Sequence, residues 1–358
     1  MGCRDVVHGF GCGYMITSYT YESLITREKV YQAWSEFKKG KEQKIDVQLF
    51  KRNLEDNLYV LEEELRRKTY THGGYASFYV NDPKRRHIHK APVRDRLVHH
   101  LLYTYLYSIF DRTFIYDSYS CRLEKGTHKG VQRLITFARK ASKNYTKPCI
   151  SLQCDIQKFF ANVDHTILLS ILKKKIQDQD ILHLLSIILF SFQENGSQKG
   201  IPLGNLTSQI FANIYLNELD QFIKHDLRIQ HYIRYADDFI IIADCKEYLE
   251  RILPEIRRFL TDGLALTLHP KKIKYRSIYW GIDFLGYIVL PHYTLPRTKT
   301  RNRLFNKVHE KVMLYKRQGI SKNSLEQTMQ SYLGYLSHAN SFKLTNILKN
   351  QYWFWLNE

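Results

Sequence analysis

Two adjacent acidic residues, Asp237 and Asp238, lie between two short apolar segments, HYIRY (231–235) and FIIIA (239–243). Segments this apolar are typical of buried strands, and only a tight turn fits between them. The sequence therefore predicts an antiparallel hairpin with carboxylates at its tip. Two neighbouring carboxylates repel each other unless a cation lies nearby. A solvated turn is the competing interpretation, although Asp-Gly or Asn-Gly would suit a two-residue hairpin better.

A third carboxylate, Asp155, ends a short apolar segment, 150–155, that is also predicted to be a strand. Oxygen ligands favour Mg²⁺, and two such ions can hold both the attacking and the leaving oxygen of a phosphoryl transfer. If the strands are neighbours, Asp155, Asp237 and Asp238 converge on such ions. These three residues are the predicted catalytic residues.

The rest of the chain predicts an α+β fold with a small antiparallel sheet. The period of the apolar residues predicts helices before and after each strand, and alternation around Asn81-Asp82-Pro83 predicts a basic hairpin. Helices are expected within 24–70, 93–114, 131–142, 165–193, 208–225, 246–262 and 301–358, the hairpin over 73–89, and further strands near 264–268 and 284–289.

The chain is strongly basic, with 54 Lys and Arg against 35 Asp and Glu and a formal net charge of +19. The 26 Tyr and 19 Phe are interleaved with this charge. Cations engage phosphates and aromatic rings stack on bases, so nucleic acid is the favoured partner, with solubility as the other reason for the charge. We expect no membrane partner and a cytoplasmic location, because the sequence has no long apolar block.

The segment YADD (235–238) resembles the catalytic YxDD hairpin of reverse transcriptases, and CDIQKFFANVDH (154–165) resembles their first aspartate motif. Five other segments resemble further motifs of that family, in the family's order, and the resemblance spans about residues 80–290. These segments are RRHIHKAPVRDRLVHH, DSYSCRLEKGTHKGVQRL, GIPLGNLTSQIFANIYLNELD, LTLHPKKIKY and FLGY.

This resemblance implies an RNA-directed DNA polymerase with a right-hand fold of fingers, a palm with a small antiparallel sheet, and a helical thumb. The implied N-terminal helices and fingers are residues 1–147. The palm is 148–165 and 200–290, with 166–199 as an insertion, and the thumb is 291–358. The implied substrates are template RNA, a primer or growing cDNA, and deoxynucleoside triphosphates.

The resemblance also implies roles for single residues. Asp155 and Asp237, with the carbonyl of Ile156, hold two Mg²⁺ ions, for which Mn²⁺ can substitute, and Asp238 lies beside them. The implied nucleotide-binding residues are Arg86, Lys84, Phe160, Leu203, Gly204 and Lys272. The implied nucleic-acid-binding residues are Arg122, Lys125, Ser208, Gln209, Phe284, Leu285, Gly286 and Tyr287. Alternatives stay open: Lys271 for Lys272, core packing for Phe160, and a solvated basic loop for Arg122 and Lys125.

One departure from the common family pattern points to a subgroup. Most members have Pro-Gln-Gly and then Ser-Pro, whereas this chain has Pro202-Leu203-Gly204 and Ser208-Gln209. This is similar to the reverse transcriptases of diversity-generating retroelements, which misincorporate opposite template adenines and work with a small basic accessory protein. Such enzymes are bacterial, archaeal or phage-encoded. The alternatives are a conventional bacterial enzyme of retron, group II intron-like or antiviral-defence type, and a non-catalytic RNA-binding protein.

Overall fold

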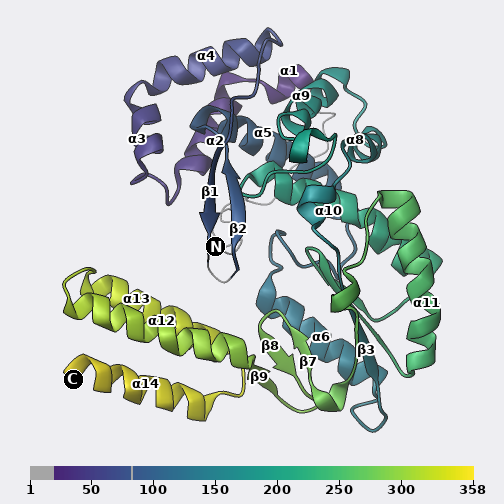
Figure 1. Cartoon of the computed structure of the whole chain (residues 1–358). Coiled ribbons are helices and arrows are strands. Elements are labelled where there is room, and N and C mark those ends of the chain that lie inside the picture. Colours follow the sequence, from purple (N-terminus) through teal and green to yellow (C-terminus); the bar gives the residue numbers. More distant parts are fainter. Residues whose placement is uncertain (1–19, 82–83) are drawn as a thin grey trace.

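The N-terminal part of the chain is a group of helices that carries one hairpin (Figure 1). The computed structural model describes residues 20–81 and 84–358. Thr20 and Thr26 cap the first two helices, because their hydroxyls accept backbone N–H groups that the helix leaves unpaired. The elements are α1 (Tyr21–Leu24), α2 (Arg27–Lys38), α3 (Ile45–Arg52), α4 (Leu54–Arg66), β1 (Ala76–Val80), β2 (Arg86–Lys90) and α5 (Val93–Phe110).

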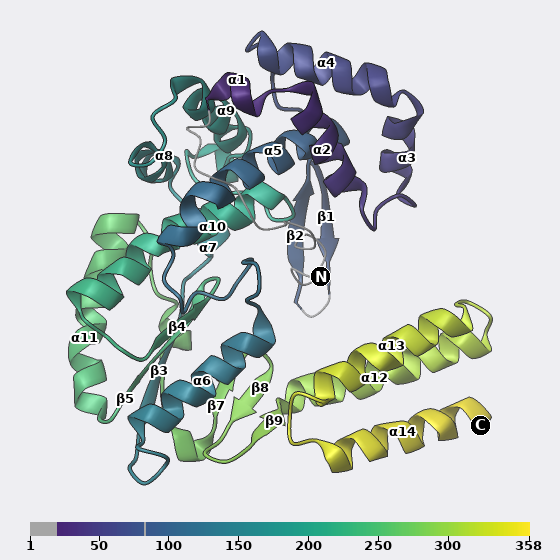
Figure 2. The same ribbon diagram turned by 180° about the vertical axis from the view of Figure 1, so that it is seen from behind.

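The central sheet has four antiparallel strands in the order β4-β5-β3-β6. Its strands are β3 (Ile150–Asp155), β4 (Tyr232–Tyr235), β5 (Asp238–Ala243) and β6 (Lys274–Ser277). After its first residue, Asp238, strand β5 is apolar because both faces are covered. Ile240 and Ile242 pack with α6 (Thr127–Ala141) on one face (Figure 2), while Phe239 and Ile241 join the main core with α10 (Leu206–Gln221) and α11 (Lys246–Arg258).

The segment 165–193, expected to be one helical stretch, forms two helices. They are α8 (His165–Lys173) and α9 (Gln179–Phe190), and a one-turn helix, α7 (Phe159–Asn162), precedes them. Asp164 caps α8 and Asp178 caps α9 through their side-chain oxygens. The break follows from Asp178, because a side chain that caps a new helix competes with continuation of the old one.

A second sheet, β7 (Ile282–Phe284), β8 (Tyr287–Val289) and β9 (Thr294–Pro296), leads into three C-terminal helices with a core of their own. The helices are α12 (Thr298–Lys316), α13 (Lys322–Leu336) and α14 (Phe342–Asn357). Two reciprocal hydrogen bonds attach α13 to the β7–β8 hairpin. The Tyr335 hydroxyl donates to the Gly286 carbonyl at 2.6 Å, and the Tyr287 hydroxyl donates to the Tyr335 carbonyl at 2.9 Å.

The α+β prediction is confirmed, but two of the expected strands differ. The segment 264–268 contains a left-handed residue, Ala265 (φ +49°), and makes one isolated bridge, between Leu268 and Ile156, whereas the fourth strand of the central sheet is β6. The segment 284–289 is not one strand. It turns at Leu285 and Gly286, whose φ angles of +52° and +93° suit a two-residue hairpin. No helix within 20–81 or 84–358 is long and apolar enough to cross a membrane.

Candidate active site

The three predicted catalytic carboxylates lie together at one end of the central sheet. Asp155 is the last residue of β3 and lies directly opposite Asp238, the first residue of β5. Asp238 also pairs with Tyr235, so the turn consists of Ala236 and Asp237 alone. The expected hairpin is present, but Asp238 belongs to the strand rather than to the turn. The backbone N–H of Ile156 donates to the Asp237 carbonyl at 3.3 Å, which fastens the turn to the end of β3.

Burial, together with the neighbouring negative charges, raises the pKa of two of these carboxyls. Burial, with a smaller contribution from the charge of Asp155, raises the pKa of Asp237. Burial also raises the pKa of Asp238 to about 7, together with a hydrogen bond to Asp155 and the charge of Asp237. Near neutral pH this cluster therefore shares a proton or attracts a cation.

A cation already contacts the cluster, because the Lys272 ammonium lies 2.6 Å from Asp155 Oδ2. Among the described residues no three His, Cys, Asp or Glu side chains are arranged to hold a metal ion as they stand. The donor set nevertheless fits a divalent cation. It consists of three adjacent carboxylates, and Mg²⁺ prefers oxygen ligands. Such an ion would take the place of the shared proton.

Arg234, which is not among the residues predicted from the sequence, supports the turn at Ala236 and Asp237 through a hydrogen bond. Its side chain is fully buried and binds Asp220 of α10 through two hydrogen bonds of 2.8 and 2.6 Å. It also donates to Asn213 Oδ1 (3.3 Å), Ser118 Oγ (3.2 Å) and the Ala236 carbonyl (3.1 Å). Ala236 has a φ of +54°, a conformation that costs a residue other than glycine energy. The only sequence signal is an arginine inside a strand predicted to be buried.

The predicted nucleotide-binding loop lies against the hairpin β1–β2. The Leu203 carbonyl accepts a hydrogen bond from the His89 N–H at 2.9 Å, and Leu203 itself is half-buried. Gly204 has a φ of +112°, and a Cβ added there would lie 2.7 Å from Ile88 Cγ2. Only glycine permits this close approach, so hairpin and loop are held together at Gly204.

Of the other residues predicted to contact nucleotide, Arg86 and Lys272 act on the carboxylates. Arg86 is exposed at the start of β2, and its charge acts on Asp237 to lower that pKa, against the larger effect of burial. Phe160 is half-buried and packs edge-on against Phe159, with ring centroids 5.3 Å apart. Of the two candidate lysines, Lys272 contacts Asp155, whereas Lys271 is exposed.

Lys84 and Arg85 lie at the end of the hairpin, and both are exposed. The Arg85 guanidinium lies over the ring of Tyr79, 4.1 Å from its centroid. Arg85 therefore interacts with the hairpin itself.

The predicted nucleic-acid contacts differ in accessibility. Arg122 donates to the Asp111 carboxylate and to the carbonyl of Ile115, each at 2.7 Å, and Lys125 donates to the carbonyl of Tyr116 at 2.9 Å. These contacts hold both side chains against the loop 114–126. Ser208, Phe284 and Tyr287 are buried, whereas Gln209, Leu285 and Gly286 are half-buried.

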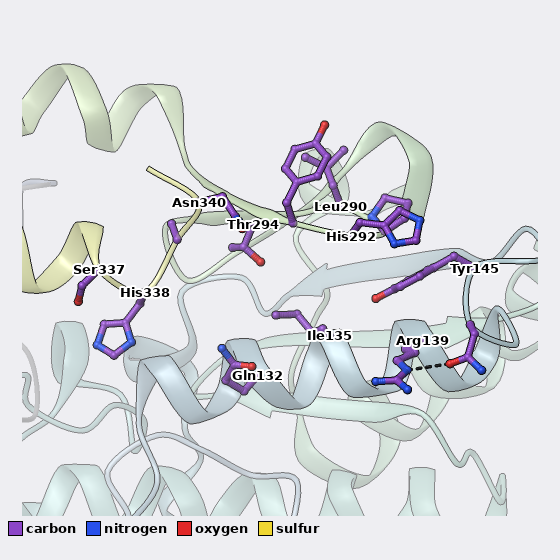
Figure 3. A pocket seen from close by; sticks show the side chains of 14 residues that line it. Gln132, Ile135, Arg139, Tyr145, Leu290, His292, Thr294, Ser337, His338 and Asn340 are labelled. Carbon is purple, nitrogen blue, oxygen red and sulfur yellow. Dashed lines mark hydrogen bonds between the residues drawn. The ribbon is translucent and has the colours of Figure 1, made fainter. Parts of the chain in front are cut away.

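A separate cavity of about 770 Å³ lies between α6, the loop after β8 and the turn before α14 (Figure 3). Polar and aromatic side chains line it, and none of the three carboxylates is among them. Asn340 connects its walls, because its backbone N–H donates to the Thr294 carbonyl at 2.7 Å and its side chain accepts from the Thr294 N–H at 2.9 Å. The cavity therefore belongs to the junction of the second sheet with the C-terminal helices.

Comparison with known proteins agrees with this geometry. The chain is 25% identical over 261 residues to protein YkfC of Escherichia coli, covering 59% of this chain and 67% of that protein. It is 22% identical over 303 residues to the group II intron-encoded protein LtrA of Lactococcus lactis, covering 65% of this chain and 49% of that protein. The chain thus spans about two thirds of the first relative and about half of the second.

A solved structure of apo telomerase from Candida tropicalis shares the fold, with a TM-score of 0.50 at 11% identity over 66% of this chain and 52% of that one. The sequence profile described as "Reverse transcriptase (RNA-dependent DNA polymerase)" matches residues 81–289, more than half of the chain. This family uses divalent metal ions and copies RNA templates. The chain belongs to the reverse transcriptase family of RNA-dependent DNA polymerases.

Proposed function

We propose that this reverse transcriptase copies a template RNA into cDNA within a diversity-generating retroelement, with misincorporation opposite template adenines. The observation that carries this proposal is the pair Leu203 and Gln209, where most members of the family have Gln and Pro. Leu203 lies in the loop beneath the hairpin β1–β2, and an apolar side chain there offers no hydrogen bond to an incoming nucleotide. Discrimination is strongest where a wrong partner leaves polar groups unpaired, so this loss loosens selection.

In the proposed mechanism Asp155 and Asp237, with the carbonyl of Ile156, hold two Mg²⁺ ions. Bound Mg²⁺ lowers the pKa of the primer 3′-hydroxyl and offsets the charge that builds on the pyrophosphate. Arg86 binds the triphosphate, a task suited to a planar donor. Lys272, which contacts Asp155 at 2.6 Å, would donate a proton to the pyrophosphate leaving group.

The proposed domains follow the three groups of elements. Residues 1–147 are the N-terminal helices and fingers, which deliver Arg86 and Lys84 from β1–β2. Residues 148–165 and 200–290 are the palm, with 166–199 inserted, and 291–358 are the thumb. The proposed primer contact is the turn at Leu285 and Gly286, which Tyr335 of α13 supports through a hydrogen bond.

The catalytic assignment is tested by Asp237→Asn, compared with Asp244→Asn, which changes an exposed aspartate just after β5. Primer extension in Mg²⁺ should fall by at least about 10²–10³-fold in the first variant, in line with the loss of a main electrostatic stabiliser. RNA affinity should stay within about twofold, because Asp237 contacts no phosphate in the proposal. Extension at the unmodified rate would contradict the assignment.

The subgroup is tested by sequencing cDNA made on a defined RNA, with a small basic accessory protein present. Errors should concentrate at template adenines. Leu203→Gln should lower those errors about two- to tenfold, which is the change in discrimination expected from the free energy of one hydrogen bond. Leu203→Ile adds no hydrogen bond and should leave the errors unchanged. Equal errors at all four template bases would favour a conventional enzyme of retron, group II intron-like or antiviral-defence type. The similarity to LtrA keeps that second candidate open.

A further inference from the structure

The cavity in Figure 3 has no acidic residue in its walls. Its lining residues belong to α6 and the loop after it, to the loop between β8 and β9 with the start of β9, and to the turn between α13 and α14. No Asp or Glu occurs in the three stretches of sequence that contain these residues, 125–154, 284–309 and 327–357. Lys140, Lys143 and Lys147, from the first of these stretches, are exposed. The cavity is therefore suited to an anionic ligand.

Arg139 supplies a hydrogen-bond donor for such a ligand. Its Nε donates to Asn144 Oδ1 at 2.7 Å, which fixes the guanidinium at the wall of the cavity (Figure 3). Among residues 20–81 and 84–358, no carboxylate pairs with Arg139. The rest of its guanidinium is thus available to a ligand, and this planar group suits two phosphate oxygens. His292 and His338, both exposed, also line the cavity.

Tyr145 reaches the cavity from a strained turn. Lys143, Asn144 and Tyr145 have φ angles of +49°, +57° and +64°, so three consecutive residues other than glycine are left-handed. This conformation is unfavourable for each of them, and such strain persists where the surrounding structure holds it, often at sites that bind a ligand. Here the Asn144 N–H donates to the Arg139 carbonyl at 2.8 Å, and the Tyr279 hydroxyl donates to the Tyr145 carbonyl at 3.2 Å. The turn thus holds Tyr145 and Arg139 at the same end of the cavity (Figure 3).

An aromatic ring beside a cation is the combination that binds a base together with its phosphate. Tyr145 and His292 pack edge-on with ring centroids 5.1 Å apart, and Tyr293, which also lines the cavity, is 46% exposed. The volume of about 770 Å³ is within the range of roughly 300–1,000 Å³ that is typical of small-molecule sites. We propose that this cavity binds one nucleotide unit, with its phosphate at Arg139 and its base against Tyr145. Such a unit is a free nucleotide or an unpaired nucleotide of an RNA strand, and both present the same chemistry.

The cavity is separate from the catalytic centre. Tyr145 lies shortly before β3, which begins at Ile150, whereas Asp155 is the last residue of that strand. A strand rises about 3.3 Å per residue, so the length of β3 separates the turn 143–145 from the carboxylates. The proposed site is therefore additional to the one in which Arg86 would bind the triphosphate. It does not depend on the proposed polymerase activity.

The experiment measures the fluorescence of 2-aminopurine, which falls when this base stacks on a ring, with the full chain in EDTA. The probes are 2-aminopurine riboside, its 5′-monophosphate, and an RNA of about six nucleotides with 2-aminopurine at its centre. The monophosphate should bind about tenfold more tightly than the riboside. Arg139→Gln should remove this difference and leave the affinity for the riboside unchanged. Tyr145→Ala should weaken binding of all three probes about tenfold, as expected for one lost stacking partner, whereas Tyr145→Phe should not.

The two sources of the nucleotide unit are distinguished by the RNA probe. An RNA that binds no more tightly than the monophosphate identifies a free nucleotide as the ligand. An RNA that binds more tightly, and is weakened by the same two variants, identifies an RNA strand.

The matched control is Arg258→Gln, which removes an exposed arginine from α11 and should leave all three affinities unchanged. Arg86→Gln, in the proposed catalytic site, should leave the affinity for the monophosphate unchanged. The proposal would be overturned if neither phosphate-bearing probe bound, if Arg139→Gln and Tyr145→Ala both bound the monophosphate normally, or if Arg86→Gln weakened it equally. Primer extension by the unmodified protein in Mg²⁺ tests the polymerase activity in a separate measurement.

Discussion

Replacing Arg234 by methionine should both destabilise the protein and impair catalysis. Arg234 is fully buried, with two hydrogen bonds to Asp220, and methionine keeps the bulk of the side chain without its charge. Asp220 would remain buried without its cation, beside the Tyr232 hydroxyl, which donates to it at 2.6 Å. Breaking a buried ion pair by removing one partner costs about 3–5 kcal/mol, because the remaining charge is uncompensated. That is a large part of the stability of an ordinary domain.

The catalytic effect has a different origin from the loss of stability. Arg234 donates to the carbonyl of Ala236, whose φ of +54° is unfavourable, and Asp237 follows directly. A hydrogen bond from a charged donor contributes about 1.5–3 kcal/mol, equivalent to a factor of about ten or more. Without it the turn should relax and Asp237 should shift. We therefore expect kcat to fall at least about tenfold and the Mg²⁺ requirement to rise, with little change in the KM for nucleotide.

A double variant separates the two effects. Arg234→Met with Asp220→Leu removes both charges, and replacing a buried pair by apolar residues is often neutral for stability. Denaturant unfolding should therefore show recovery of most of the lost stability, whereas primer extension at graded Mg²⁺ should stay impaired. Wild-type stability in the single variant would refute the account of the ion pair. Full activity in the double variant would show that the hydrogen bond to the Ala236 carbonyl does not position the turn.

Three further predictions concern the same centre. Because the pKa of Asp238 is raised to about 7, protons compete with cations below that pH, so Mg²⁺ should raise Tm more at pH 8 than at pH 6; an equal rise at both would contradict this. Gly204→Ala should weaken nucleotide binding, measured as KM, because its Cβ would collide with Ile88; an unchanged KM would argue against the contact. Tyr335→Phe removes the hydrogen bond to the Gly286 carbonyl, so primer–template affinity should fall about two- to tenfold in a binding titration, with nucleotide KM unchanged.

The sequence predicts most helices and the catalytic hairpin, because their apolar residues follow one period clearly. It fails at 264–268 and at β6 for a physical reason. Leu264, Leu266 and Leu268 are buried, but the backbone partners of this segment are scattered. The Leu266 N–H donates to the Leu260 carbonyl, the Thr267 carbonyl accepts from Gln157, and the His269 N–H donates to the Asp155 carbonyl at the end of β3. Alternation of apolar residues along a segment predicts which side chains are buried, but it does not predict which strand the backbone pairs with. Strand β6, with the sequence KYRS, is a polar edge strand without an apolar face to detect.

The site is predictable as far as its motifs reach along the chain. The placement of Asp155 opposite Asp238 follows once the strands are known to be neighbours, and the resemblance to reverse transcriptases supplies that knowledge. Contacts between segments that are distant in the sequence cannot be predicted from local patterns. Arg234 reaches Ser118 across 116 positions of sequence, and no local pattern indicates that pair. The burial of Ser208 likewise depends on how α10 packs.

Helix α10 joins the two halves of the candidate site. It begins at Leu206, directly after the loop with Leu203 that is proposed to bind nucleotide, and its later residues Asn213 and Asp220 bind Arg234, which supports the turn at Ala236 and Asp237. A helix is stiff over this length, and the pair at its far end is buried and multiply bonded. The loop with Leu203 and the turn at Ala236 and Asp237 are therefore both fixed to helix α10. We therefore expect a substitution of Leu203 to leave the carboxylates in place, because the turn is held by Arg234 and not by the side chain at position 203.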